Sequence, residues 1–336
     1  MPSNEAAWLD ALGSSLDVRA APYPSPSPHD IVIRNGAVAI NPTDWYQREH
    51  KLFDLQFPVI LGHDTAGTVV EVGSAVTRFK VGDRVLALGE SNSFQRYVLA
   101  PEVLVSRIPN TMSYEDACVI PLCYCTAASG LYQKDFLALQ HPSVHPKPTG
   151  KVLIIWAAST SVGSNGVQLG VASGYEVFAT SSSHNFDYVK KLGASKVFDY
   201  NSETVVEDMV QALNGRTVAG VLDCFVLNGA VEKCAEVLRR SDGAVKFIAT
   251  AQPTTTELEG GVKTKFIWGS SLRDNEVGKA VFEDYLPHAL EAGTFVPYPE
   301  AEVIGNGLEA IQIGMDTLKK GVSAKKIVVS LSQASW

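Results

Sequence analysis

The sequence lacks a long apolar run. Its longest uninterrupted apolar segment extends from Val152 to Ala158, far short of the about 20 residues that a membrane-spanning helix needs. The first residues, Met1–Trp8, also lack the basic cluster and apolar stretch of a secretory signal. We therefore expect a cytoplasmic protein that does not enter a membrane.

Excess positive charge is also missing. The chain has 28 lysines and arginines against 36 aspartates and glutamates, which gives a net charge of −8. No basic cluster falls on one face of an expected element, so nucleic acid is not an expected partner. Five cysteines, an odd number, are scattered over 336 residues, which indicates free thiols rather than a disulfide framework.

Metal-ligand spacings are scarce as well. Cys118, Cys123 and Cys125 lie close together along the chain, and two histidines follow at His141 and His145. Each of these histidines precedes a proline, and a second cysteine pair is missing, whereas a structural zinc site takes four ligands. We expect buried free thiols here and no metal.

The sequence does have two contrasting halves. With 336 residues and 46% hydrophobic content, two domains are expected. Residues 1–110 form short alternating runs between glycines and prolines, which is typical of a compact β domain. From Lys151 onward, strand patterns alternate with helix patterns, which predicts a doubly wound parallel sheet. A helix over 308–320 and a last strand over 326–331 are expected to return to the first domain.

The segment from Lys151 to Tyr200 has the order of a βαβ unit: strand, small-residue turn, helix, glycine and strand. The turn, 158–164, opens onto a helix N-terminus, where small residues let a pyrophosphate approach the main chain. Of the usual G-x-G-x-x-G glycines only Gly163 stands here, so the turn alone leaves open an ordinary buried βαβ connection.

The end of the second strand of this unit favours one dinucleotide. A chain that binds NAD usually carries Asp or Glu here for the ribose 2′-hydroxyl. This chain instead has Ser181-Ser-Ser-His-Asn185, which offers hydroxyl, imidazole and amide donors. Asp187 lies too far along to replace the missing carboxylate. The residues therefore predict NADPH rather than NADH.

Several motifs together resemble the medium-chain dehydrogenase/reductases, namely Ala39–Asp44, Leu61–Gly73 and Phe79–Val85. A closer resemblance is to fungal trans-acting enoyl reductases, stand-alone partners of polyketide synthases that lack a working internal enoyl reductase. It is carried by Ser183–Asp187, Leu192–Tyr200 and Lys319–Val329. The resemblance implies an α/β fold with a GroES-like β-rich catalytic domain, residues 1–120 and 276–336, and a doubly wound parallel (Rossmann) NADPH-binding domain, residues 121–275.

This family contains both zinc alcohol dehydrogenases and zinc-free reductases. His63 matches the histidine of the family's G-H-E motif, but Asp64 stands where Glu is usual and no cysteine precedes Cys118. Catalytic zinc needs about three protein ligands. We therefore expect no metal, and a hydrogen-bonding role for His63. Without a Lewis acid, reduction of a conjugated C=C bond is more feasible than oxidation of an unactivated alcohol.

The resemblance also assigns site residues. Thr126 matches a threonine near nicotinamide and substrate, although a helix-start cap is the alternative. Tyr46 stands where an enoyl reductase of this group carries Lys, so it either donates a proton or lines the pocket. The residues assigned to the cofactor are Asp44, Ser159, Thr160, Ser161, Val162, Gly163, Ser182, Ser183, His184, Asn185, Tyr200, Ile248, Ala249, Ser323 and Ala324.

The implied function is NADPH-dependent reduction of a conjugated C=C bond in a secondary-metabolite pathway. The substrate would be a small-molecule or carrier-bound enoyl group, with a polyketide synthase as partner. Three alternatives stay open: a quinone or enone reductase acting on free small molecules, an iminium reductase, and a catalytically silent NADPH-binding protein. Lys263 and Lys265 would blunt the edge strand around Thr264–Trp268, so we expect a monomer.

Overall fold

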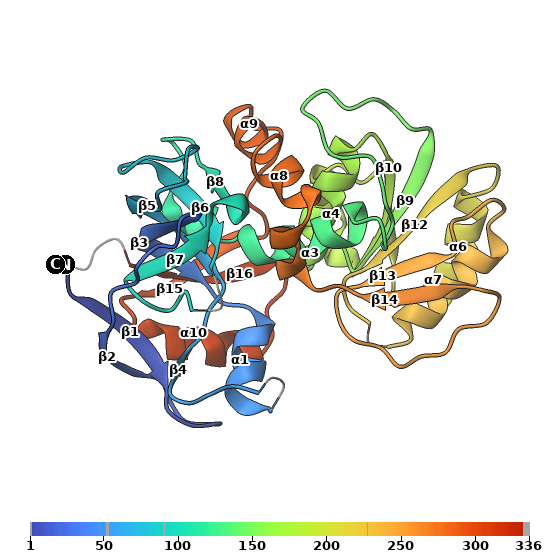
Figure 1. The fold of residues 1–336 in the computed structure, drawn as a ribbon. Coiled ribbons are helices and arrows are strands. Elements are labelled where there is room, and N and C mark those ends of the chain that lie inside the picture. The colour runs from blue at the N-terminus through green and yellow to red at the C-terminus, as the bar shows by residue number, and fades with distance from the viewer. Residues whose placement is uncertain (1, 52–53, 90–91, 227, 332–336) are drawn as a thin grey trace. The chain divides into compact units, whose positions relative to one another are not determined.

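The computed structural model describes residues 2–51, 54–89, 92–226 and 228–331. The chain divides into two compact units, which are coloured along the chain in Figure 1. The first unit comprises residues 1–122 and 290–336, and the second comprises residues 123–289. Within the described ranges, no helix combines the length and apolar character needed to cross a bilayer.

The first unit is built on two β-sheets (Figure 1). In the seven-stranded sheet the order is β15-β16-β3-β5-β6-β8, and β7 also pairs with β3. Its strands are β3 (Asp30–Ala39), β5 (Asp64–Val72), β6 (Arg84–Leu88), β7 (Tyr97–Pro101), β8 (Val105–Arg107), β15 (Glu300–Asn306) and β16 (Lys325–Ser330). The three-stranded sheet has the order β2-β1-β4, formed by β1 (Asn4–Leu9), β2 (Asp17–Ala21) and β4 (Val59–Ile60).

Strand β3 organises the larger sheet. The sequence predicts a kink at Gly36, and the pairing of β3 with β5 shifts register between Asn35 and Ala37. Glycine is required because a Cβ at this position would lie 2.2 Å from the Tyr114 ring. On its other side β3 pairs with β16, so the last strand joins the first unit, as predicted.

Among the described residues of the first unit, four segments are helical: α1 (Pro42–Glu49), η1 (Glu102–Leu104), α2 (Tyr114–Ala117) and α10 (Ala310–Lys319). In α10 the buried residues recur at helical spacing, with Ile311 and Met315 one turn apart. They pack in one cluster with Leu9 of β1, Val38 of β3 and Val329 of β16. Burying each such side chain stabilises the fold by about 1.5–3 kcal/mol.

The second unit has one parallel sheet with the order β11-β10-β9-β12-β13-β14, which confirms the doubly wound prediction. Its strands are β9 (Lys151–Trp156), β10 (Glu176–Ser181), β11 (Lys196–Asp199), β12 (Thr217–Asp223), β13 (Phe247–Thr250) and β14 (Lys263–Phe266). Its helical segments are α3 (Pro121–Tyr132), α4 (Ser161–Ala172), η2 (Ser183–Asn185), α5 (Phe186–Lys191), α6 (Val205–Ala212), α7 (Ala230–Arg240), η3 (Gly269–Asp274), α8 (Glu276–Phe282) and α9 (Leu286–Glu291).

Residues 276–289 belong to the second unit, whereas the sequence analysis assigned them to the catalytic domain. The reason is side-chain packing against α3. The hydroxyl of Tyr124 donates to the carbonyl oxygen of Val281 at 2.9 Å, and the Tyr124 ring meets Phe282 edge-on. The sequence predicts one helix from Val277 to Gly293, whereas the structure has two, α8 and α9. Pro287 lacks a backbone N–H and is tolerated only in the first turn of a helix, which is where it lies in α9.

Candidate functional site

The turn after β9 admits close approach to its main chain. Ala157 adopts a positive φ of 58°, and a Cβ on Gly163 would lie 2.5 Å from the carbonyl oxygen of Ala157. Thr160 caps α4, because its hydroxyl accepts the N–H of Gly163 at 3.1 Å. Residues 159–162 are half-buried, whereas residues 163–170 of α4 are buried. An accessible helix N-terminus of this kind favours a phosphate group.

Two predicted ribose-site residues meet at the end of β10. The hydroxyls of Ser182 and Tyr200 share a hydrogen bond of 2.5 Å. Ser183 and His184 are exposed beside them, and Asn185 is buried. The structure adds a residue that the sequence did not single out: the ammonium of Lys233 donates to the carbonyl oxygen of Tyr200 at 3.2 Å. Lys233 lies on α7, too far along the chain for a local pattern to indicate it.

The remaining predicted residues of the second unit lie on β13 and α3. Ile248 and Ala249 are completely buried within β13. Thr126 lies in the middle of α3, so it is not a helix-start cap. Gly269 packs against it: a Cβ added to Gly269 would lie 3.0 Å from the Thr126 hydroxyl.

Asp223 is a buried acid that the sequence reasoning assigned to a strand and to nothing else. It ends β12, in register with Trp156 of β9 and Thr250 of β13, at the carboxyl edge where such sheets bind ligands. Its Oδ1 accepts the N–H of Phe225 at 3.0 Å, while its Oδ2 has no hydrogen-bond partner among the described residues. Burial raises the pKa of Asp223 to about 6.

This shifted pKa predicts a pH-dependent stability difference for Asp223→Asn. The pKa of Asp223 in the folded chain lies above the ordinary aspartate value of 3.8, so ionisation destabilises the fold as pH rises from about 4 through about 6. The asparagine keeps the Oδ1 acceptor and does not ionise. We expect the variant to be more stable than the wild type by about 2–3 kcal/mol at pH 8, with little difference at pH 4.

Denaturant unfolding of the ligand-free chain at the two pH values measures this effect. The exposed Asp242 offers the matched control Asp242→Asn, which is expected to change stability little at either pH. If Asp223→Asn stabilises the chain more at pH 4 than at pH 8, the raised pKa of Asp223 is contradicted.

In the first unit, the buried Asp44 pairs with His63, which is half-buried. Asn41 caps α1 and Asp44 is its third residue, and the two form a capping box. The Oδ2 of Asp44 accepts the N–H of Asn41 at 2.7 Å, and its Oδ1 lies 3.1 Å from the Nδ1 of His63. Asp44 is completely buried, so its carboxylate is used to hold α1 and the imidazole in place.

Beside this pair lies an ion pair between Asp64 and Lys326. Lys326 Nζ lies 3.1 Å from Asp64 Oδ2, and the two side chains are 3% and 0% exposed. The amide of Asn41 bridges them, because its Nδ2 donates to Asp64 at 2.8 Å and its Oδ1 accepts from Lys326. The main-chain N–H of Leu122 donates to Asp64 Oδ1 at 2.6 Å.

These residues do not fit a catalytic zinc. His63 Nδ1 is directed to Asp44, and a buried ammonium neutralises the neighbouring Asp64. Over residues 2–51, 54–89, 92–226 and 228–331, no group of three or more His, Cys, Asp or Glu side chains is placed to hold a metal. Zinc prefers three or four nitrogen, sulfur or carboxylate ligands, so the donor set at His63 is incomplete.

The other predicted residues of the first unit are more accessible. Tyr46 is 42% exposed, and its ring stacks on Trp45 with centroids 4.0 Å apart. Ser323 is exposed, and Ala324 adopts a positive φ of 49° immediately before β16. The exposed Tyr46 is therefore available to a ligand, whereas the carboxylate of Asp44 is already bonded to Asn41 and His63.

A GroES-like β unit joined to a doubly wound parallel unit defines a class of nicotinamide-dependent oxidoreductases. The family model described as "Alcohol dehydrogenase GroES-like domain" matches residues 27–110, and the one described as "Zinc-binding dehydrogenase" matches residues 161–296. The chain belongs to the medium-chain dehydrogenase/reductase family, which confirms the predicted resemblance and fold class.

Individual relatives agree with this assignment. The chain is 46% identical to "Dehydrogenase pigH" of Monascus ruber, over 98% of this chain and 100% of the relative. It is 41% identical to "Trans-enoyl reductase himH" of Aspergillus japonicus, over 98% of each. The crystal structure of an alcohol dehydrogenase superfamily protein from Novosphingobium aromaticivorans is similar with a TM-score of 0.81, at 22% identity over 98% and 99% of the two chains.

Proposed function

We propose that this protein is an NADPH-dependent, zinc-free enoyl reductase. It would act in trans, as the stand-alone partner of a polyketide synthase of the fungal type. The observation that carries the proposal is the likeness to a relative named trans-enoyl reductase over nearly the whole of both chains. The incomplete donor set at His63 supports it, because reduction of an already polarised C=C bond does not need a metal Lewis acid.

The choice of NADPH rests on the end of β10. Residues 181–185, which end β10, include no carboxylate that would repel a 2′-phosphate, and the hydroxyls of Ser182 and Tyr200 lie together. The Lys233 ammonium, 3.2 Å from the Tyr200 carbonyl oxygen, adds positive charge next to them. Hydrogen bonds from hydroxyls and an ammonium to a phosphate are charge-assisted and strong.

When bound, NADPH supplies the hydride that is added to the β-carbon of the enoyl thioester. The protein's own part is to place the reactants and to deliver one proton to the α-carbon. The turn at residues 159–163 holds the pyrophosphate, and Thr126 lies near the reacting groups by family likeness. Tyr46 has an accessible hydroxyl and is the proton donor in this proposal. A polyketide synthase carrier domain presents the substrate to a monomer.

The proposal is tested by NADPH consumption with a crotonyl thioester, a quinone, and no added substrate. We expect oxidation of NADPH with the thioester, formation of the saturated thioester, and much slower reaction with NADH. Turnover of the quinone alone would indicate a quinone reductase instead. Binding of NADPH without turnover of any substrate would indicate a catalytically silent protein.

Tyr46→Phe tests the proton donor. Phenylalanine keeps the ring that stacks on Trp45 but removes the hydroxyl. We expect kcat for the crotonyl thioester to fall by about 100-fold, the lower end of what general acid catalysis contributes. The Kd for NADPH, measured by fluorescence, is expected to stay the same. Unchanged turnover would show that Tyr46 merely lines the pocket and that water delivers the proton.

A further inference from the structure

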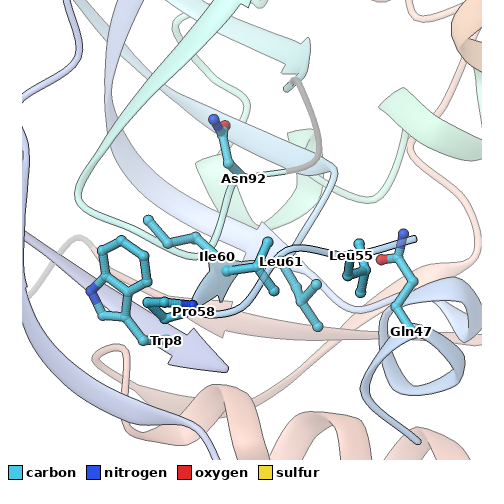
Figure 2. A pocket seen from close by; sticks show the side chains of 8 residues that line it. Trp8, Gln47, Leu55, Pro58, Ile60, Leu61 and Asn92 are labelled. Atoms are coloured by element: carbon cyan, nitrogen blue, oxygen red, sulfur yellow. The ribbon is translucent and has the colours of Figure 1, made fainter. Parts of the chain in front are cut away.

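The pocket of the first unit carries no titratable side chain among its described lining residues. Its volume is about 400 Å³. Figure 2 shows its walls, which are formed by apolar side chains, one indole and two amides. The lining residues are Trp8, Gln47, Leu55, Pro58, Val59, Ile60, Leu61 and Asn92. The second unit, by contrast, buries an ionisable acid next to the turn that is proposed to hold the pyrophosphate.

This acid is Asp223, at the carboxyl end of β12. It is in register with Trp156, the last residue of β9, and the turn starts with the following residue, Ala157. Neighbouring strands of a sheet are about 4.8 Å apart. The N–H of Cys224 donates to the carbonyl oxygen of Trp156 at 3.1 Å, and the Cys224 thiol lies beside the hydroxyl of Thr160. Asp223 is thus fixed beside the main chain of the turn.

The Asp223 carboxyl is sealed inside the protein. The residue is 0% exposed, so it acts on a ligand through its charge and not by contact. Its Oδ1 accepts the N–H of Phe225, whereas its Oδ2 has no hydrogen-bond partner among the described residues. Burial raises the pKa of the carboxyl to about 6, so the group changes its charge near neutral pH. The effective dielectric constant inside a protein is about 4–20, far below that of water, so this charge is poorly screened.

The titratable groups that face Asp223 are negative or neutral. On α7 they are the carboxylate of Glu232 and the thiol of Cys234, and on the segment after β12 the thiol of Cys224. Burial raises the pKa of both thiols, so neither is charged near neutral pH. The residues in register on β9 and β13 do not titrate, and α4 has no titratable residue. Within the described part of the chain, no cation therefore compensates the ionised carboxylate.

We infer that dinucleotide binding is linked to a proton on Asp223: the cofactor binds more tightly when this carboxyl is protonated than when it is ionised. A bound pyrophosphate brings negative charge to the turn, and like charges in a poorly screened interior repel each other. By linkage, the bound cofactor in turn favours the protonated carboxyl. The inference rests on the proposed pyrophosphate site but not on the enoyl reductase activity.

The experiment measures the Kd of the full chain for NADPH by fluorescence from pH 5 to pH 8, for the wild type and for Asp223→Asn. Asparagine keeps the acceptor for the N–H of Phe225 and does not ionise. We expect equal affinities at pH 5 and about 10-fold weaker binding by the wild type at pH 8. Repulsion of this size arises between unit charges about 10 Å apart at an effective dielectric constant of about 20. The exposed Asp242 offers the matched control Asp242→Asn, which should follow the wild type at every pH.

The 2′-phosphate of NADPH also titrates in this range, because a phosphate monoester has a second pKa of about 6. The ratio of the wild-type and variant Kd values cancels this contribution, and NADH, which lacks the 2′-phosphate, should give the same trend in that ratio. Proton uptake is an independent readout. Calorimetry at pH 6.5, in two buffers that differ in ionisation enthalpy, should show about half a proton more taken up per bound cofactor by the wild type than by Asp223→Asn.

A ratio of Kd values that stays the same between pH 5 and pH 8 would overturn the inference. So would tighter binding by the wild type than by Asp223→Asn at pH 8, or binding of neither dinucleotide. Failure of the proposed function has a different signature. A pH-dependent ratio without turnover of the crotonyl thioester would reject the reductase activity and keep the role of Asp223, and the same ratio with a preference for NADH would reject only the choice of cofactor.

Discussion

Replacing Gly163 by valine is expected to raise the Kd for NADPH by about 100-fold or more. A Cβ at this position would lie 2.5 Å from the carbonyl oxygen of Ala157 and 2.6 Å from the Cα of Ala158, both main-chain atoms. The turn therefore has to move, and a displacement of about 1 Å in a positioned site is enough to cost about 100-fold. Quenching of protein fluorescence by NADPH measures the affinity.

The control for this variant lies on the same helix. Val171 is exposed at the other end of α4, and Val171→Ala is expected to bind NADPH like the wild type. Thermal melting separates a local effect from unfolding. A folded Gly163→Val protein with wild-type affinity would show that the dinucleotide does not use this turn.

The second large effect is expected from Lys326→Met. This change leaves the carboxylate of Asp64 completely buried without its ammonium partner, and it removes the donor to Asn41 Oδ1. Breaking a buried ion pair from one side destabilises a protein by about 3–5 kcal/mol. We expect that loss in denaturant unfolding of the ligand-free chain, in the transition that reports the first unit.

Two further variants show whether burial is the cause. Lys325 is adjacent, but its ion pair with Glu300 is solvent-exposed, so Lys325→Met is expected to change stability little. The double variant Asp64→Asn with Lys326→Met removes both charges and should recover much of the loss. Equal destabilisation by Lys325→Met and Lys326→Met would contradict this explanation.

Local patterns in the sequence determined the fold class and the outline of the cofactor site. The alternation of strands and helices after Lys151 predicted the doubly wound sheet, because each βαβ unit is a local motif with a restricted handedness. The serines at 181–183 predicted the hydroxyl-rich end of β10 in the same way.

What the tertiary structure decided depends on residues that are distant along the chain. Asp64 meets Lys326 because β16 pairs with β3, and Trp8, Gln47 and Asn92 share a pocket because three separate segments converge there. The raised pKa of Asp223 likewise comes from burial. Periodicity and capping are set by neighbours within about four residues, whereas burial and charge pairing are set by which strands and helices pack together, and no local pattern encodes that.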